Sequence, residues 1–153
     1  LPVGKTAFIV SKLGLFLLSD LVFATLLTVI NLGIPVGLSV LPHVLLQTGI
    51  LSMFMALAGF FCALLLPGFR QFSLLYLVLV VFITTPVFLA GQTGIAWDWI
   101  KYHPMYPLFM AMKNAYWGVS AANGIYYTIC GLTMIALFLL VRHVLVREMA
   151  KEG

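Results

Sequence analysis

Charged side chains are scarce in this sequence. Only 8% of its 153 residues are Asp, Glu, Lys or Arg, whereas a soluble domain carries about 25%. This scarcity excludes an ordinary soluble globular domain. In their place, 63% of the residues are hydrophobic and the mean hydropathy is +1.16. The composition therefore predicts an integral membrane protein.

The sequence signatures of catalysis are missing as well. There is no glycine-rich phosphate loop, no HExxH motif and no dense cluster of His, Asp and Glu. The histidines are dispersed and poorly placed to activate a Ser or Cys nucleophile. The two cysteines, Cys62 and Cys130, lie in apolar segments without a CxxC spacing, so we expect small hydrophobic residues rather than a redox pair. We predict that the chain is not an enzyme by itself and binds no cofactor of its own.

Four long apolar stretches account for most of the chain. They cover residues 7–31, 42–66, 72–92 and 115–141, and each reaches the length of about 20 residues that crosses a bilayer as a helix. The Gly and Pro residues of "NLGIPVGLSVLPH" predict a short loop between the first two. We therefore expect an all-α fold, a bundle of four transmembrane helices forming a single domain over residues 1–153.

The basic residues lie at the ends of these stretches and predict the topology. With the N-terminus inside, six of them fall on the inner side and two on the outer side. The positive-inside rule then favours an arrangement with both termini inside. The net charge of +4 therefore reflects topology, and we expect no nucleic-acid partner. The inner residues are Lys5, Lys12, Arg70, Arg142, Arg147 and Lys151, and the outer ones are Lys101 and Lys113.

The longest connection, residues 91–118, joins the third and fourth spans and is rich in Trp, Tyr and Met. Aromatic rings with a polar edge gather at the level of the lipid headgroups. We expect this segment to lie in the membrane interface and to include a short surface helix. An alternative use of its apolar face is the docking of a partner.

A single acid interrupts the first span, in "GLFLLSDLVFATLL". An ionised Asp20 near the middle of a membrane helix costs about 2.5–3.5 kcal/mol on insertion scales. Three interpretations remain open for this predicted buried acid and its neighbour Ser19. The acid is neutral and hydrogen-bonded to a neighbouring helix, it pairs with a cation of a partner subunit, or it serves proton transfer or lipid binding.

The last span opens with polar and small residues, in "WGVSAANGIYYTICG". Ser120 and Gly124 form a small-xxx-small row, which lets another helix approach closely. Asn123, Tyr126 and Tyr127 add polar groups beside that row. The pattern predicts a helix-packing seam with hydrogen bonds across it, and a ligand site is the alternative. Thr48, Ser52 and Gln92 of the earlier spans are further residues expected in this seam.

The first two spans resemble subunit III of the haem-copper terminal oxidases. "GLFLLSDLVFATLL" is similar to that family's first conserved helix, with Ser19 and Asp20 in the place of its Ser-Glu pair. "LPHVLLQTGILSMFMALA" resembles, without gaps, the helix that follows, with Thr48 and Ser52 in register.

The later spans extend the resemblance over residues 8–145. "FLAGQTGIAWDW" keeps the glutamine of the family's motif as Gln92. "NGIYYTICGLTMIALFLL" is similar to the penultimate helix, with Asn123, Tyr126 and Tyr127 where the family has histidines. The family's last helix has no counterpart here.

The resemblance implies a non-catalytic accessory subunit of a respiratory complex. It would support assembly, lipid binding and the access of protons or oxygen to the catalytic subunit. Haem and copper would belong to partner subunits I and II, phospholipid would bind in a cleft, and the membrane would be the prokaryotic plasma membrane or the mitochondrial inner membrane. An alternative is a membrane anchor that binds haem or quinone for a peripheral dehydrogenase, with His43 and His103 as ligands. A third possibility is a self-contained carrier.

Overall fold

The computed structural model describes residues 4–66, 68–90, 98–119 and 124–151. Throughout these ranges the regular structure is helical and there is no β-strand, so the predicted all-α fold is confirmed. The elements in chain order are α1 (Lys5–Leu32), α2 (Ile34–Leu65), α3 (Phe69–Ala90), the short 3-10 helix η1 (Asp98–Tyr102), α4 (Tyr106–Tyr116) and α5 (Gly124–Lys151).

Four of these helices are long and apolar enough to cross a membrane, as expected. The qualifying segments are Thr6–Leu32, Ile34–Leu65, Phe69–Pro86 and Gly124–Glu148. Two predicted boundaries need correction, because the second helix begins at Ile34 rather than at residue 42, and the last begins at Gly124 rather than at residue 115.

The predicted loop between the first two spans is mostly helix. Only Gly33, with a φ of 76°, separates α1 from α2. Pro35 lies in the first turn of α2, where its missing N–H has no intrahelical partner to lose. Pro42 lies inside the helix, and membrane helices tolerate proline there when neighbouring groups satisfy the freed carbonyl. The proline and glycine residues were therefore misleading as loop signals.

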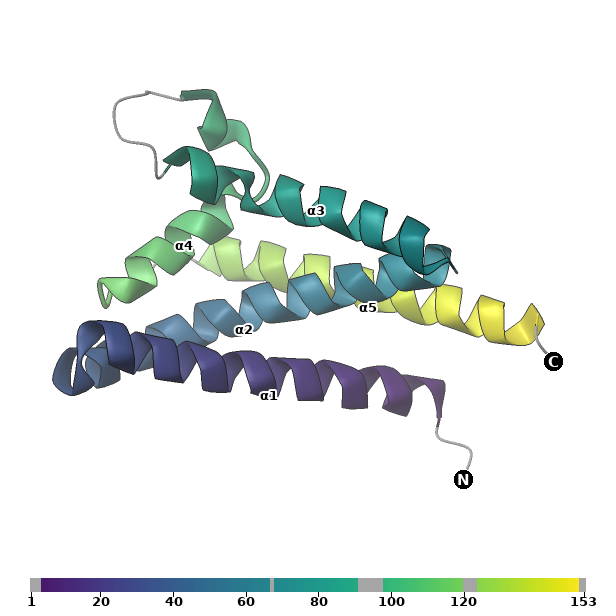
Figure 1. Ribbon diagram of the computed structural model, residues 1–153, viewed down its shortest axis with the longest axis horizontal. Helices are drawn as coiled ribbons and strands as arrows, with labels where there is room; N and C mark the ends of the chain where they lie inside the picture. The colour runs from purple at the N-terminus through teal and green to yellow at the C-terminus, as the bar shows by residue number, and fades with distance from the viewer. Residues whose placement is uncertain (1–3, 67, 91–97, 120–123, 152–153) are drawn as a thin grey trace.

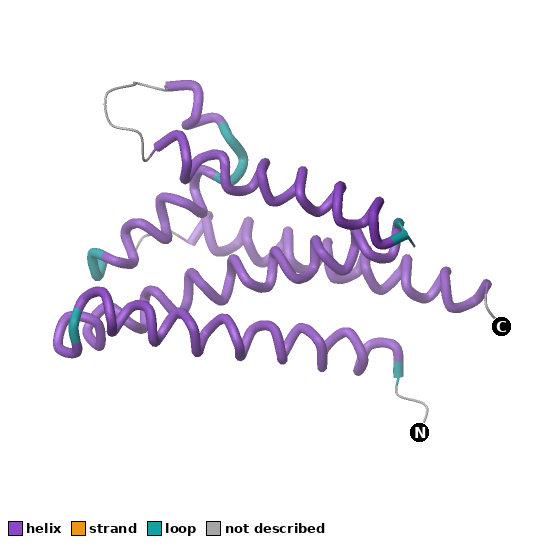
Figure 2. Tube along the Cα trace, in the orientation of Figure 1, coloured by secondary structure: helices purple, strands orange, loops and turns teal. Residues whose placement is uncertain are grey.

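The long helices run up and down the bundle, and both chain ends lie at the same end of it (Figure 1). This arrangement agrees with the prediction that the termini share one side of the membrane, while the side itself stays a prediction. Helix α2 is central and packs against α1, α3, α4 and α5. The turns that join α1 to α2 and α2 to α3 are short (Figure 2).

The best-buried apolar cluster joins α1, α2 and α5. Ile9, Leu13, Leu57 and Val141 are at most 4% exposed there. Elsewhere the helices leave large apolar side chains uncovered. Phe23, Val78 and Leu132 are 65%, 66% and 63% exposed, respectively. In a bilayer, lipid tails cover such residues at no cost.

Between α3 and α5, the expected surface helix is α4. It packs on α2 and buries Ala111 and Ala115. Ala115 lies in one cluster with Val40 and Val44 of α2. Four of the aromatic side chains expected at the interface are exposed, namely Trp99, Tyr102, Tyr116 and Trp117. Tyr106 is half-buried, and Trp97 lies outside the described residues. The helix therefore covers the part of α2 that was predicted to be loop.

Gly37 allows α1 and α2 to approach closely next to their turn. A Cβ atom on Gly37 would lie 3.0 Å from the Val29 Cα atom and 3.2 Å from the Thr28 carbonyl oxygen. Both are backbone atoms, which cannot move aside. We predict that Gly37→Ala lowers the free energy of unfolding by about 1–3 kcal/mol, the usual effect of overpacking.

The measurement is thermal unfolding in detergent, followed by circular dichroism. Gly14→Ala in α1 is the matched control, because a Cβ there meets nothing within 4 Å. Equal melting temperatures for the two variants would contradict a close contact at Gly37.

Candidate functional site

Asp20 of α1 is joined to α2 by a hydrogen bond. The Ser52 hydroxyl donates to Asp20 Oδ2 over 2.5 Å. Ser52 is only 6% exposed, so its hydroxyl is fixed in place. The structure therefore brings together two residues that the sequence analysis had assigned to different features.

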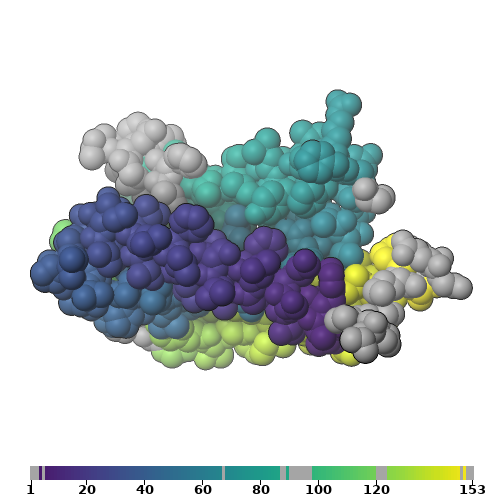
Figure 3. All heavy atoms as spheres, turned by 60° about the horizontal axis from the view of Figure 1, so that its bottom comes forward, coloured from purple at the N-terminus to yellow at the C-terminus, as the bar shows by residue number. Residues whose placement is uncertain are grey.

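The Asp20 side chain is exposed in the chain by itself, and its burial at a lipid cleft or a subunit contact stays a prediction. The reason for the exposure is the arrangement of the neighbouring helices. Helices α1 and α3 both pack against α2 but make no extensive contact with each other over the described residues. Atoms of α2 are visible between them in Figure 3. Asp20 faces the space that this arrangement leaves open.

Ser19 does not join Asp20 in this site. Its hydroxyl donates to the Leu15 carbonyl oxygen over 3.0 Å, and the side chain is exposed. Successive residues on a helix point about 100° apart, so two neighbours rarely face the same partner. The predicted pair therefore contributes one residue, Asp20, to the site.

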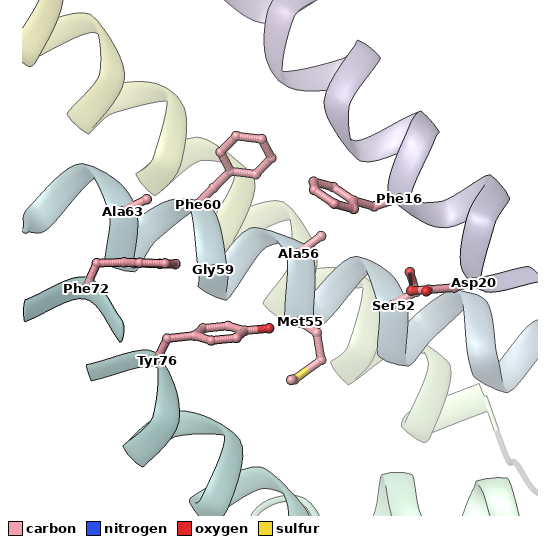
Figure 4. Close-up of a pocket in the computed structure, with 10 residues that line it drawn as sticks. All are labelled: Phe16, Asp20, Ser52, Met55, Ala56, Gly59, Phe60, Ala63, Phe72 and Tyr76. Carbon is pink, nitrogen blue, oxygen red and sulfur yellow. Dashed lines mark hydrogen bonds between the residues drawn. The ribbon is translucent and has the colours of Figure 1, made fainter. Parts of the chain in front are cut away.

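The space between α1, α2 and α3 is a pocket of about 470 Å³. Asp20 and Ser52 lie at one end of it, and aromatic side chains lie along the rest (Figure 4). The lining residues are Phe16, Asp20, Ser52, Met55, Ala56, Gly59, Phe60, Ala63, Phe72 and Tyr76. The site is thus an acid at the end of an otherwise largely apolar pocket.

Small residues of α2 form the floor of the pocket. Ser52, Ala56, Gly59 and Ala63 line it, and their spacing places them on one face of the helix. A Cβ atom on Gly59 would lie 3.4 Å from Tyr76 Cε2, so the Tyr76 ring lies close over the backbone. This row was not predicted from the sequence, although its small-xxx-small spacing is typical of a face where another helix approaches closely.

The walls of the pocket are aromatic and come from all three helices. Phe16 belongs to α1, Phe60 to α2, and Phe72 and Tyr76 to α3 (Figure 4). The Phe72 and Tyr76 rings are stacked, with their centroids 5.7 Å apart. The pocket therefore offers aromatic surface on either side of its floor.

Within the described ranges, Asp20 has no positively charged partner. An ion pair joins Lys101 Nζ to Asp98 Oδ1, 3.0 Å apart and both within η1. This contact raises the pKa of Lys101, chiefly through the hydrogen bond that Asp98 accepts. It lies at the exposed connection and not at the pocket. The Asp20 carboxyl therefore has Ser52 as its hydrogen-bond partner and no counter-charge from this part of the chain.

A second polar contact joins α2 to α5. The Tyr126 hydroxyl donates to Gln47 Oε1 over 2.9 Å, and Gln47 Nε2 donates to the Tyr127 hydroxyl over 3.2 Å. Gln47 is only 2% exposed. The structure thus places Tyr126 and Tyr127 in a polar seam between helices. Gln47 was missed, although a glutamine within an apolar span is itself a signal of such a contact.

Among the other residues expected in the seam, Thr48 and Gly124 do not join these contacts. Thr48 is half-buried on α2. Gly124 begins α5, and a Cβ atom there would meet nothing within 4 Å. Within the described ranges no other helix approaches closely at that position, contrary to the prediction from the small-xxx-small row. Gln92, Ser120 and Asn123 lie outside the described residues.

The two candidate haem ligands have different surroundings. His103 Nδ1 accepts the Met105 backbone N–H over 3.2 Å, and its ring lies 4.6 Å from the Phe82 ring, centroid to centroid. His43 is half-buried on α2. In the described part of the chain, no hydrogen bond or ring contact joins the two, and no three His, Cys, Asp or Glu residues lie close enough to share a metal ion.

Comparison with protein families, with curated proteins and with solved structures finds no match. The resemblance to oxidase subunit III therefore rests on its motifs alone.

We predict that Gln47 and Tyr126 are energetically coupled. In a double-mutant cycle, Gln47→Leu and Tyr126→Phe should show a coupling energy of about 0.6–1.7 kcal/mol, the range for hydrogen bonds between membrane helices. The measurement is equilibrium unfolding in mixed micelles. The control pair is Gln47→Leu with Thr128→Val, because the Thr128 hydroxyl bonds to its own helix at the Gly124 carbonyl. A coupling energy equal to that of the control pair would refute the contact.

Proposed function

We propose that this chain is a non-catalytic accessory subunit of a membrane complex, with subunits I and II of a haem-copper oxidase as its partners. The observation that carries the proposal is the Asp20 carboxyl group, which is exposed in the single chain and bonded to one hydroxyl. Ionisable side chains within a membrane normally face a protein interior or a water-filled cavity. A partner chain that closes the open side of the pocket would provide such surroundings.

The position of Asp20 along α1 supports this argument. At about 1.5 Å per residue, Asp20 lies about 22 Å from the Lys5 end of α1 and about 18 Å from its Leu32 end. The hydrocarbon core is about 30 Å thick. Because α1 is longer than this core, its ends extend beyond it, and a core centred on α1 places Asp20 about 12 Å inside the nearer boundary. The short aspartate side chain does not reach the headgroups from there. The acid therefore needs a partner at its own depth.

The resemblance supplies the class of partner. In the subunit III family a membrane acid and a lipid-holding cleft accompany a catalytic subunit that carries the haem and copper. Here the corresponding features are Asp20 and the pocket between α1, α2 and α3. The proposed roles are to support assembly, to hold phospholipid or another amphipathic molecule, and to shape proton or oxygen access. The proposed location is a prokaryotic plasma membrane or the mitochondrial inner membrane.

We expect the chain, extracted from native membranes in mild detergent, to co-purify with haem-copper subunits I and II. Mass spectrometry identifies the chains, and an optical spectrum identifies their haems. Asp20→Asn should reduce the recovery of these partners several-fold. The neutral amide no longer needs the polar surroundings that the partner chain would supply to the acid. Asp98→Asn is the control, since Asp98 is exposed and paired with Lys101 outside the pocket.

Two outcomes would overturn the proposal. Flavin or iron-sulfur chains with b-type haem would indicate a dehydrogenase anchor, and nucleotide-hydrolysing chains would indicate a transporter. Full recovery of subunits I and II with Asp20→Asn would show that Asp20 does not contribute to the interface.

A further inference from the structure

We propose that the pocket between α1, α2 and α3 binds an organic cation with an apolar body, such as a hydrophobic quaternary ammonium or phosphonium ion. The inference rests on the proposed function in one respect only: a partner chain closes the open side of the pocket. The ligand class follows from the charge, the lining and the depth of the pocket itself.

No positively charged side chain lies beside Asp20 within the described ranges, where the Ser52 hydroxyl donates to Asp20 Oδ2. Lys101 pairs with Asp98 in η1, away from the pocket. A cation that enters the pocket would therefore meet a carboxyl group that has no counter-charge from these residues.

The lining favours an organic cation over a metal ion. The side-chain oxygens that line the pocket belong to Asp20, Ser52 and Tyr76, whereas Ca²⁺ takes about 6–8 oxygen ligands and Mg²⁺ about six. Aromatic rings attract organic cations through their π faces, and the attraction grows when water is excluded. Phe16, Phe60, Phe72 and Tyr76 supply four such rings.

The size and direction of the pocket fit a small amphipathic molecule. Its volume of about 470 Å³ lies within the range of about 300–1,000 Å³ that is typical of small-molecule sites. The floor extends from Ser52 to Ala63, about 16 Å along α2 at about 1.5 Å per residue. Figure 4 shows Asp20 and Ser52 at one end, with the aromatic rings lying toward Ala63. A bound cation would place its charge at Asp20 and its apolar body along the rings.

The depth of Asp20 distinguishes this ligand from an ordinary phospholipid. A phospholipid holds its ammonium group at the membrane surface, whereas Asp20 lies about 12 Å inside the nearer boundary of a hydrocarbon core of about 30 Å centred on α1. A cation that is itself lipophilic carries its charge to that depth. Charge and depth together therefore favour a lipophilic cation as the occupant.

The test is equilibrium binding of radiolabelled tetraphenylphosphonium to the purified complex in lipid nanodiscs. We expect saturable binding that Asp20→Asn weakens about thirtyfold or more, as for the loss of one partner of a buried charge pair. Tyr76→Leu should weaken it about threefold or more, because one aromatic face is lost. Asp98→Asn, outside the pocket, should leave the affinity unchanged.

Tetraphenylborate is the matched probe, since it has nearly the same size and shape but a negative charge. Equal saturable binding of the two ions, or an affinity for tetraphenylphosphonium that Asp20→Asn does not change, would overturn the inference. If Asp20→Asn does not fold or does not assemble with its partners, Ala56→Leu serves instead, because it narrows the floor of the pocket and keeps the Asp20 carboxyl group. Unchanged affinity in that variant would also overturn the inference.

The binding and co-purification experiments can fail separately. Recovery of subunits I and II without charge-selective binding would leave the proposed function standing and reject the ligand. Charge-selective binding in a complex with other chains would support the ligand and reject the haem-copper assignment.

Discussion

Polar side chains within a bilayer have no water to bond to. In this chain several of them bond to a carbonyl of their own helix, and α2 provides the partners of those that bond across helices. Ser52 of α2 bonds to Asp20 of α1, and Gln47 of α2 bonds to Tyr126 and Tyr127 of α5. Lipid tails are as apolar as leucine, so the hydrophobic effect does little to select one helix pairing over another. Hydrogen bonds and close packing to a central helix therefore decide how α1 and α5 are placed.

The same helix creates the pocket. Helices α1 and α3 both pack on α2 without extensive contact between them, and the small residues of α2 leave the space between them unfilled. Larger side chains at Ala56 or Gly59 would occupy that space. The pocket is thus a consequence of the central position of α2 and of short side chains along one of its faces.

The acid and the pocket suggest a chain that works together with other molecules. A carboxylate at mid-membrane depth is costly when lipid tails surround it, and one hydroxyl only partly offsets that cost. The proposed partner chain and the proposed cation would address different parts of the problem. The partner over the open side would remove contact with lipid tails, and the cation within the pocket would balance the charge.

The sequence by itself determined that this is a helical membrane protein with four spans, because hydropathy is a property of each segment and needs no knowledge of its neighbours. It also singled out Asp20, since one acid in an apolar run is conspicuous. Only the tertiary structure decided that Ser52 is its partner, that Gln47 meets two tyrosines, and that α2 continues through Pro42. These features depend on how the helices are rotated about their axes and on which backbone groups receive hydrogen bonds from neighbouring residues. That information lies in the contacts between segments and not within any one of them.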